Sequence, residues 1–480
     1  MPDKADLVIR NAVLIDGSGG PARRGDLAVA GGRILALGLL PELAADREVD
    51  AGGQVLCPGF VDAHTHDDRL LLSDPAMTPK VSQGVTTVVA GNCGVSLAPL
   101  VTQERPVPPL DLLGTDWYRF AEFGRYLEAV DDARPVTNSV FLLGHQTLRF
   151  CAMGHDLDRP ATGPEIAQMG REVEKAMAAG SIGLSTGLFY PPAIAAPTSE
   201  IVALARIAGA SGGLYATHLR DEGDALEDSV AEALAIGRDG GLPVIFSHHK
   251  ATGRPNFGKV KRSLAQIDAA AATQKVALDV YPYAAGSTVL LPQRIAMAEK
   301  VMITWSEALP DAGGRYLHDL AAEHGLTDLA MAERLQPAGA IYFMMDEADV
   351  QTVLRHPLAM IGSDGIPHDP RPHPRLWGTF ARVLGHYVRD LNLMPLEEAV
   401  RRMTALPADT FGLRDRGRLV PGAWADLVLF DPVTVIDRAS FDNPIQASAG
   451  IGLVAVNGEI VWRDGAATGA RPGRALRRAA

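Results

Sequence analysis

Cysteine is scarce in this sequence: Cys57, Cys93 and Cys151 are the only three among 480 residues. Three thiols cannot build a disulfide framework, so we expect a protein of a reducing, cytoplasmic compartment. Long apolar runs are also missing, and the start, Met1-Pro-Asp-Lys-Ala-Asp6, lacks a basic segment followed by an apolar stretch. The sequence therefore predicts neither a membrane span nor a targeting segment.

Positive charge is in the minority, with 45 Lys and Arg against 57 Asp and Glu and a formal net charge of -12. Nucleic-acid binding requires a clustered basic surface, so this balance argues against DNA or RNA as a partner. We expect the basic end, Arg471-Pro-Gly-Arg-Ala-Leu-Arg-Arg478, to be a solvated tail. An acidic protein with an anionic substrate would need cationic side chains in its pocket.

Both ends of the chain contain short apolar runs separated by Gly and Asn turns, which is typical of β-strands. The runs are Asp6–Arg10, Ala12–Asp16, Asp26–Ala30, Arg33–Leu37, Asp426–Phe430 and Val454–Trp462. Because they bracket a long middle region, we expect residues 1–57 and 415–480 to form one small β-sandwich domain.

The middle of the chain alternates strand-like apolar runs with helical stretches such as Pro164–Ala179 and Leu226–Asp239. Eight strands are predicted: Leu56–Ala63, Thr86–Ala90, Val140–Leu143, Ile182–Thr186, Gly213–Thr217, Pro243–Ser247, Val276–Val280 and Ala359–Gly362. This alternation predicts an α/β fold, a (β/α)₈ TIM-like barrel over residues 58–285 and 346–414. The long gap between strands seven and eight, residues 286–345, is predicted to be an inserted lid or subdomain.

Side chains that bind metals or exchange protons follow most of the predicted strands. Five of the 13 histidines occupy three strand ends, and a cysteine and an aspartate follow two others: His64, His66, His218, His248, His249, Cys93 and Asp364. Active sites of such barrels lie at the carboxyl ends of the strands, where these side chains would meet. This clustering is the strongest indication of function in the sequence.

The residue types at these positions suit a zinc ion. His64 and His66 are two residues apart in an extended segment and can face the same side. His218 and His248 can supply imidazole nitrogen and Cys93 thiolate, which leaves one of zinc's four positions open for water. A single intracellular cysteine is more usually a small buried hydrophobe, but the position of Cys93 directly after a buried strand favours a metal ligand. His249 has the opposite parity to His248, so we assign it to packing or hydrogen bonding.

Asp364 stands in a Gly-Ser-Asp-Gly turn that leaves its carboxylate bare. Such an aspartate can simply cap its own turn. Beside a zinc ion, which lowers the pKa of a water toward about 7, it is the candidate general base.

Two segments resemble the amidohydrolase superfamily. Pro58-Gly-Phe-Val-Asp-Ala-His-Thr-His66 is similar to its metal-binding start, and Gly417-Arg-Leu-Val-Pro-Gly-Ala-Trp-Ala-Asp-Leu-Val428 is similar to its return into the β-sandwich. The fourth predicted strand lies in Ser181–Tyr190, which lacks the lysine that bridges two metals in several members. With Cys93 after strand two, this pattern resembles the N-acyl-D-amino acid deacylases.

The resemblance implies roles for the matching residues. Cys93, His218 and His248 would hold one tightly bound zinc ion, and the pair His64 and His66 would form a second, weaker site. Asp364 would be the catalytic acid and base. The implied reaction is zinc-dependent hydrolysis of the amide bond of an N-acyl-D-amino acid to a carboxylate and a free D-amino acid.

The resemblance also implies substrate-binding residues. The α-carboxylate would be bound by Lys250, Tyr281 and Ser287, and the pocket would be lined by Phe189, Tyr342 and Met345. Lys250 shares its parity with His248, which favours the pocket over a solvated surface position. Arg294 would pair with a second carboxylate and favour N-acyl-D-glutamate. An arginine on the surface is an equally good interpretation of its position.

Two other functions fit the same sequence. One is hydrolysis of a cyclic amide such as hydantoin or dihydropyrimidine, against which the missing strand-four lysine counts. The other is a non-catalytic scaffold of the same fold, although such proteins usually lack one or more metal ligands. The sequence does not define the oligomeric state.

Overall fold

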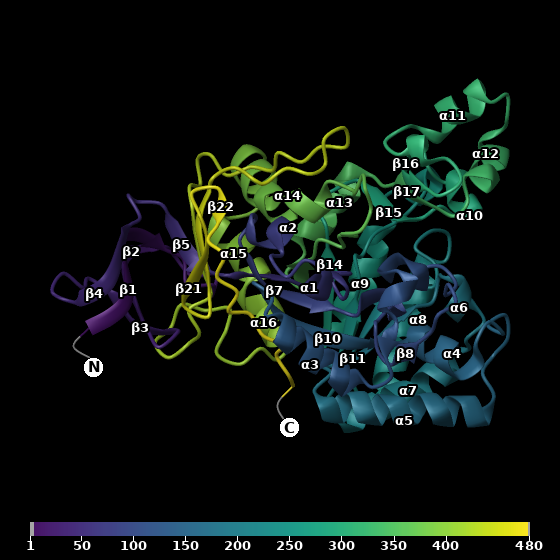
Figure 1. Cartoon of the computed structure of the whole chain (residues 1–480), viewed down its shortest axis with the longest axis horizontal. Coiled ribbons are helices and arrows are strands. Elements are labelled where there is room, and N and C mark those ends of the chain that lie inside the picture. Colours follow the sequence, from purple (N-terminus) through teal and green to yellow (C-terminus); the bar gives the residue numbers. More distant parts are fainter. Residues whose placement is uncertain (1–3, 479–480) are drawn as a thin grey trace.

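The middle of the chain forms a nearly closed barrel of eight parallel strands with helices around it (Figure 1). The structure is a computed structural model that describes residues 4–478, so the first three and last two residues of the predicted terminal segments lie outside it. The strands follow one another in chain order: β6 Phe60–Asp62, β7 Val85–Ala90, β10 Asn138–Gly144, β11 Gly183–Gly187, β12 Leu214–His218, β13 Val244–Phe246, β14 Val276–Val280 and β18 Ala359–Ile361. The predicted (β/α)₈ fold is confirmed.

Helices cover the barrel with one apolar face each. In α5 (Gly163–Ala179) the buried side chains recur every three or four residues, which is the spacing of one helical face. A capping box between Thr162 and Glu165 fixes where this helix begins. The other helices of this region are α1 Leu70–Ser73, α2 Thr78–Val81, α3 Phe123–Ala133, α4 His145–Met153, α6 Pro191–Ile194, α7 Thr198–Ala210, α8 Leu226–Gly240, α9 Val260–Ala271, α13 Glu347–Arg355, α14 Arg375–Arg382, α15 Leu396–Met403 and α16 Ala405–Thr410.

The first predicted strand is in fact two strands in different sheets. Its beginning is β5 (Val55–Pro58), which pairs with strands of the terminal sheet, and its end is β6 of the barrel. The break is at Gly59, where an added Cβ would lie 2.2 Å from the Thr86 hydroxyl oxygen. A continuous strand was predicted because both halves are fully buried and, apart from Asp62, apolar, so the run of hydrophobic residues does not reveal the change of sheet.

Both chain ends contribute to a single nine-stranded sheet. Its strands, besides β5, are β1 Lys4–Leu14, β2 Arg23–Ala30, β3 Arg33–Gly38, β4 Ala44–Asp50, β19 Leu427–Phe430, β20 Ile451–Val456, β21 Glu459–Arg463 and β22 Ala466–Ala467. The first two predicted strands are one strand, β1, with a bulge at Asn11. The N-terminal strands are not all antiparallel, because β1 pairs in parallel with both β4 and β5.

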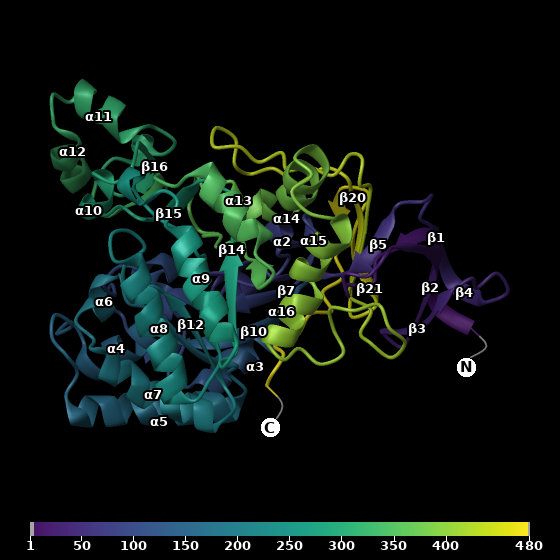
Figure 2. The same cartoon turned by 180° about the vertical axis from the view of Figure 1, so that it is seen from behind.

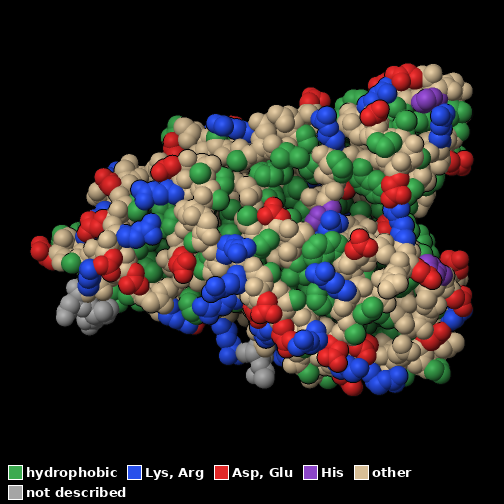
Figure 3. Space-filling model, in the orientation of Figure 1, with side chains coloured by type: hydrophobic (Ala, Val, Ile, Leu, Met, Phe, Trp, Pro, Cys, Tyr) green, Lys and Arg blue, Asp and Glu red, His purple; other side chains and the backbone are tan. Residues whose placement is uncertain are grey.

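The segment between β14 and β18 forms a second small sheet with three helices. Its elements are β15 Ala285–Val289, α10 Pro292–Ile295, β16 Lys300–Ser306, α11 Leu317–Glu323, α12 Asp328–Leu335 and β17 Ala338–Phe343. The segment projects from the end of the molecule opposite to the terminal sheet (Figures 1 and 2). Where it meets the barrel the surface is hollowed into a groove (Figure 3), lined among others by Arg254, Phe257, Met297 and Phe343.

The basic C-terminal segment is not a solvated tail, so that prediction was wrong. Its backbone runs beside β10, where the Ser139 amide donates to the Arg474 carbonyl at 2.9 Å and the Leu476 amide donates to the Ser139 carbonyl at 2.7 Å. Ala475 is buried. Charge alone suggested a tail, whereas the backbone hydrogen bonds hold it in place.

Within residues 4–478, none of the helices combines the length and the apolar character that crossing a membrane requires.

Candidate metal centre and active site

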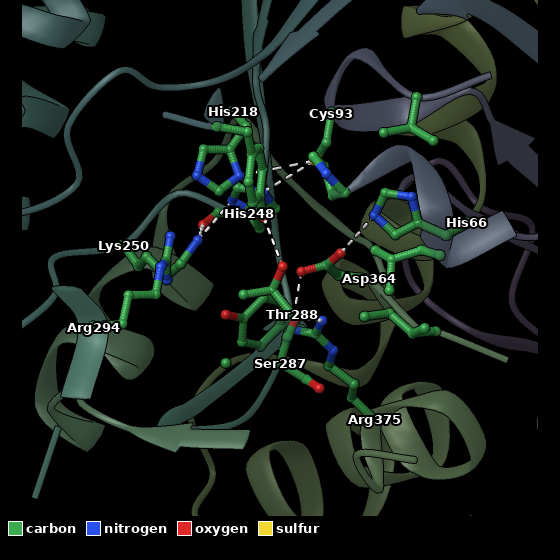
Figure 4. A pocket seen from close by; sticks show the side chains of 17 residues that line it. His66, Cys93, His218, His248, Lys250, Ser287, Thr288, Arg294, Asp364 and Arg375 are labelled. Atoms are coloured by element: carbon green, nitrogen blue, oxygen red, sulfur yellow. Dashed lines mark hydrogen bonds and ion pairs between the residues drawn. The ribbon is translucent and has the colours of Figure 1, made fainter. Parts of the chain in front are cut away.

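The predicted site residues meet in a cavity at the carboxyl ends of the barrel strands. The lining residues are His66, Cys93, Val95, Pro109, Leu112, Tyr190, His218, His248, Lys250, Tyr281, Gly286, Ser287, Thr288, Arg294, Asp364, Ile366 and Arg375. Figure 4 shows Cys93, His218 and His248 converging on one side of it, with Asp364 and His66 beside them.

The sulfur and imidazole atoms have the spacing of metal ligands. Cys93 Sγ lies 3.4 Å from His248 Nε2, 3.9 Å from His218 Nδ1 and 3.3 Å from His64 Nε2. Ligand atoms that share one tetrahedral zinc ion are about 3.3–3.6 Å apart, given zinc–nitrogen and zinc–sulfur bonds of about 2.0 and 2.3 Å. Cys93, His64 and His248 have this spacing, whereas His218 lies farther from Cys93 and groups with His248 and Glu222, with ligand atoms within 4.8 Å of one another. The donor types are those that bind zinc.

A second group of ligand atoms adjoins the first and shares His64 with it. Asp364 Oδ1 lies 3.2 Å from His66 Nε2 and 3.5 Å from His64 Nε2. The three ligand atoms lie within 4.8 Å of one another, as do those of Cys93, His64 and His248. His64 is oriented by Asp279, whose Oδ2 is 3.3 Å from His64 Nδ1. The site thus offers two overlapping groups of candidate metal ligands.

Three of these residues adopt a backbone conformation that side chains rarely tolerate. Cys93 has φ 53°, His248 has φ 37° and Asp364 has φ 49°. Each such residue costs on the order of 1–3 kcal/mol, and strained positions of this kind concentrate at functional sites. None of the three lies inside a barrel strand, so each side chain is presented by the loop that follows one.

The electrostatics of the cavity keep the thiol and the carboxyl ionised. Burial raises the pKa of the Cys93 thiol, but His64 and His248 outweigh it, and the pKa lies well below its usual range. Burial likewise raises the pKa of Asp364, but Arg375 and His64 outweigh it and hold the pKa well below its ordinary value. Burial lowers the pKa of His218 to about 4, which leaves its imidazole neutral. Zinc binds thiolate and neutral imidazole, so the Cys93 thiol and the His218 ring have the form that a zinc site requires.

Lys250 lies in the cavity wall, and its ammonium group already has protein partners. Its Nζ donates to Glu222 Oε1 at 2.6 Å and to the His248 carbonyl at 2.9 Å, and it lies 2.6 Å from His248 Nδ1. Two of the three donors of this ammonium group are therefore used by acceptor oxygens of the protein. Glu222 was not predicted as a site residue, although its position four residues after His218 could have suggested it.

Two arginines face the cavity, and only one was predicted. Arg294 lies 4.2 Å above the Phe189 ring, and its Nη2 is 3.8 Å from Glu222 Oε2. Arg375, which sequence reasoning missed, is buried with its Nη1 2.9 Å from Asp364 Oδ2. It begins α14, eleven positions after Asp364, and no local pattern in the sequence marks it.

The remaining predicted residues divide between the cavity wall and its surroundings. Tyr281 and Ser287 line the cavity. Tyr342, by contrast, is buried behind β15, where its hydroxyl accepts from the Leu291 amide at 2.7 Å and donates to the Val289 carbonyl at 3.1 Å. Phe189 and Met345 are not among the lining residues either, and Met345 Sδ accepts from the Tyr281 hydroxyl at 3.6 Å.

His249 points away from the metal ligands, as its parity predicts. Its Nε2 lies 2.8 Å from Ser263 Oγ of α9, and burial lowers its pKa to about 3.

The fold and the cavity are those of the amidohydrolases, and this chain belongs to the Amidohydrolase family, whose sequence profile matches residues 47–462. Three relatives from Alcaligenes xylosoxydans xylosoxydans match almost end to end. A D-aminoacylase is 53% identical, covering 99% of this chain and 98% of its own. An N-acyl-D-aspartate deacylase is 52% identical (99% and 95%), and an N-acyl-D-glutamate deacylase is 49% identical (100% and 98%).

Solved structures agree with these relatives. A D-aminoacylase crystal structure matches with a TM-score of 0.97 at 52% identity, covering 99% of this chain and 100% of its own, and a D-aminoacylase with a binuclear metal center matches equally well. An N-acyl-D-glutamate deacylase from Bordetella bronchiseptica, solved with zinc and a phosphonate mimic of the tetrahedral intermediate, matches with a TM-score of 0.96 at 48% identity (99% and 100%).

Proposed function

We propose that this chain is a zinc-dependent deacylase that hydrolyses N-acyl-D-amino acids to a carboxylate and a free D-amino acid. The observation that carries the proposal is the meeting of Cys93, His218 and His248 beside Asp364 in a closed cavity with cationic walls. The preference for the D configuration is taken from the relatives, because the spacing of the site residues does not reveal handedness.

Cys93, His218 and His248 would hold the principal zinc ion, as the resemblance to the deacylases implies and the Cys93 contacts support. His64, His66 and Asp364 are the candidate ligands of a second, weaker one. When bound, zinc polarises an amide carbonyl and makes hydroxide available near neutral pH. All of these side chains are buried. Glu222 Oε1, 3.2 Å from His248 Nδ1, orients the His248 ring, as carboxylates commonly do for ligating histidines.

Asp364 would move the proton. Arg375 and His66 keep its carboxylate ionised, so that it can accept a proton from the attacking water at one oxygen. The protonated carboxyl then gives that proton to the nitrogen of the leaving amine, which departs as the free amino acid. General acid–base catalysis of this kind typically contributes about 10²–10⁴-fold.

The cationic walls would receive the substrate carboxylates. Arg375 Nε has no hydrogen-bond partner among the described residues and faces the cavity with Tyr281 and Ser287. Arg294 lines the cavity beside Glu222 and would bind a side-chain carboxylate, which favours N-acyl-D-glutamate.

A substrate screen with zinc measured in the same sample tests this function. We expect hydrolysis of N-acetyl-D-amino acids, weak or no hydrolysis of the L forms, and zinc bound to the active protein. Turnover of hydantoin in place of the acyl amino acids would establish the cyclic-amide alternative instead. Protein without zinc and without turnover would point to a non-catalytic scaffold.

We propose three domains. The terminal domain comprises residues 1–57 and 415–480, the catalytic domain residues 58–285 and 346–414, and the inserted domain residues 286–345. The insertion is proposed as a lid because its residue Arg294 lines the cavity. We also propose a cytoplasmic location, since Cys57, Cys93 and Cys151 are all free thiols.

A further inference from the structure

The barrel has a seam between its first and last strands. In the eight-stranded sheet, β6 and β18 stand at the two ends of the strand order. A few backbone contacts cross between them: the Ala63 amide donates to the Ile361 carbonyl at 3.1 Å, and the Asp364 amide donates to the His64 carbonyl at 2.8 Å. The two halves of the second ligand group lie on opposite sides of this seam, with His64 and His66 after β6 and Asp364 after β18.

A buried lysine bridges the seam from outside the barrel. Lys80 lies in the short helix α2 and is 0% exposed. Its Nζ donates to Asp62 Oδ2 and to Ser363 Oγ, each at 2.9 Å, and lies 3.2 Å from Asp67 Oδ2. Its three donors thus reach the end of β6, the turn that carries Asp364, and the loop after His66.

Asp62 and Ser363 also align the chain at the end of β6 with the chain at the end of β18. Asp62 Oδ1 accepts from the Ser363 amide at 2.7 Å, and Ser363 Oγ accepts from the Gly365 amide at 3.2 Å. Gly362 allows this close approach, because an added Cβ would lie 2.6 Å from the His64 Cβ. Side chains here replace the ladder of hydrogen bonds that aligns the other neighbouring strands.

Gln83, three residues after Lys80, contacts helix α14, whose first residue, Arg375, forms an ion pair with Asp364. Gln83 Nε2 donates to the Leu376 carbonyl at 2.8 Å, and Gln83 Oε1 accepts from the Phe380 amide at 3.1 Å. Both partners belong to α14, whose first residue is Arg375. The segment from Lys80 to Gln83 is therefore connected both to the turn that carries Asp364 and to the helix that carries Arg375, the ion-pair partner of Asp364.

We propose that Lys80 is a positioning residue for the reaction: by holding Asp62 and Ser363 together across the seam, it sets the distance from Asp364 to His64 and His66. The role in catalysis rests on the function proposed above. Lys80 has no contact with the cavity, so it acts only through the residues that it aligns.

Ser363→Ala tests this with the smallest change. It removes the acceptor that Lys80 uses on the β18 side and leaves Lys80 paired with both carboxylates, so no buried charge loses its partner. Ser181→Ala is the matched control. Ser181 is also fully buried, and its hydroxyl accepts from the amide two residues later, Gly183, at 3.3 Å, but it lies at the other end of the barrel, before β11.

Two readouts separate positioning from general packing. The first is steady-state kinetics on the zinc-loaded protein: Ser363→Ala should lower kcat about 10- to 100-fold with little change in KM, because a displacement of about 1 Å costs this much. The second is amide hydrogen exchange of peptides covering residues 60–66 and 360–366, which should quicken in Ser363→Ala and not in Ser181→Ala.

Unchanged kcat and exchange in Ser363→Ala would overturn the proposal, as would equal losses of kcat in the two variants. The exchange measurement needs no substrate. If the wild-type protein does not hydrolyse N-acyl-D-amino acids, the proposed function fails, while exchange at the seam still decides whether Lys80 and Ser363 hold the two strands together.

Discussion

At the scale of single residues, Asp364 combines three features that bear on its chemistry. Its backbone is strained, with φ 49°. Its carboxylate is kept ionised by Arg375, whose Nη1 lies 2.9 Å from Oδ2, and its Oδ1 lies 3.2 Å from His66 Nε2. Asp364→Asn keeps the shape of the side chain and removes its ability to accept a proton. We expect kcat to fall by about 10²–10⁴-fold while zinc remains bound to Cys93, His218 and His248. Near-normal turnover by the zinc-loaded variant, measured by release of the free amino acid, would show that another group moves the proton.

Arg294 is the residue that would select an acidic side chain. It lines the cavity and stacks on Phe189, so its removal takes one positive charge from the cavity wall. In Arg294→Ala, kcat/KM for N-acetyl-D-glutamate should fall about 10- to 100-fold relative to N-acetyl-D-leucine, the amount that a charge-assisted hydrogen bond supplies. Arg254→Ala, in the outer groove, serves as the control. An unchanged ratio of the two substrates would remove Arg294 from substrate selection.

Residues next to a strand end were within reach of sequence reasoning, and those elsewhere were not. The strand pattern placed Cys93, His218, His248 and Asp364 at one end of the barrel, and the structure brings these four together. Arg375 and Lys80 come from helices α14 and α2, whose distance from the cavity depends on packing. Tyr342 was predicted in the pocket and lies behind it, because its strand turns the hydroxyl toward the backbone of Val289 and Leu291.

At the scale of elements, the three-stranded sheet of β15, β17 and β16 contributes to one wall of the cavity. Tyr342 in β17 ties down residues 289–291, which lead directly into α10 and Arg294. Tyr342→Phe leaves the buried Leu291 amide without its acceptor, at a cost of about 1–3 kcal/mol. We expect KM to rise several-fold with a smaller change in kcat, because Arg294 is displaced and Asp364 is not.

Tyr316→Phe is the control for that variant. Its hydroxyl contacts the exposed Lys300 at 3.3 Å in the same inserted segment but away from the cavity. Equal effects of the two substitutions on KM would mean that the insertion does not position Arg294.

Elements were predicted well where one pattern belongs to one element. All eight barrel strands and the helices α5 and α8 follow the apolar periodicity of the sequence. The boundaries failed where the chain changes sheet without changing composition, as between β5 and β6, or where a bulge interrupts a single strand, as at Asn11 in β1. Hydrophobic periodicity reports burial, and it does not report which sheet a strand joins.

At the scale of the whole molecule, the C-terminal segment closes the underside of the barrel. Besides its bonds to Ser139, the Gly473 amide donates to the Pro135 carbonyl at 2.9 Å and the Arg478 amide to the Gly180 carbonyl at 3.0 Å. Deleting residues 473–480 should lower the free energy of unfolding by about 2–4 kcal/mol, at about 1 kcal/mol for each backbone hydrogen bond lost. The kcat should stay the same, because these contacts lie at the end of the strands opposite to the cavity.

Arg477→Ala is the control for this deletion. It removes the partly exposed ion pair with Asp131, at 2.7 Å, and leaves the backbone in place, so we expect less than about 1 kcal/mol. If urea unfolding shows the same loss for this variant and for the deletion, side-chain charge rather than backbone pairing holds the segment.

The most direct test of the central claim is zinc X-ray absorption of the active protein and of Cys93→Ala. The account predicts one sulfur neighbour at about 2.3 Å with nitrogen or oxygen neighbours at about 2.0–2.1 Å. In Cys93→Ala the sulfur neighbour should disappear, and most of the zinc and the hydrolysis of N-acetyl-D-amino acids should be lost with it. Active wild-type protein whose zinc has no sulfur neighbour would contradict the metal centre described for this chain.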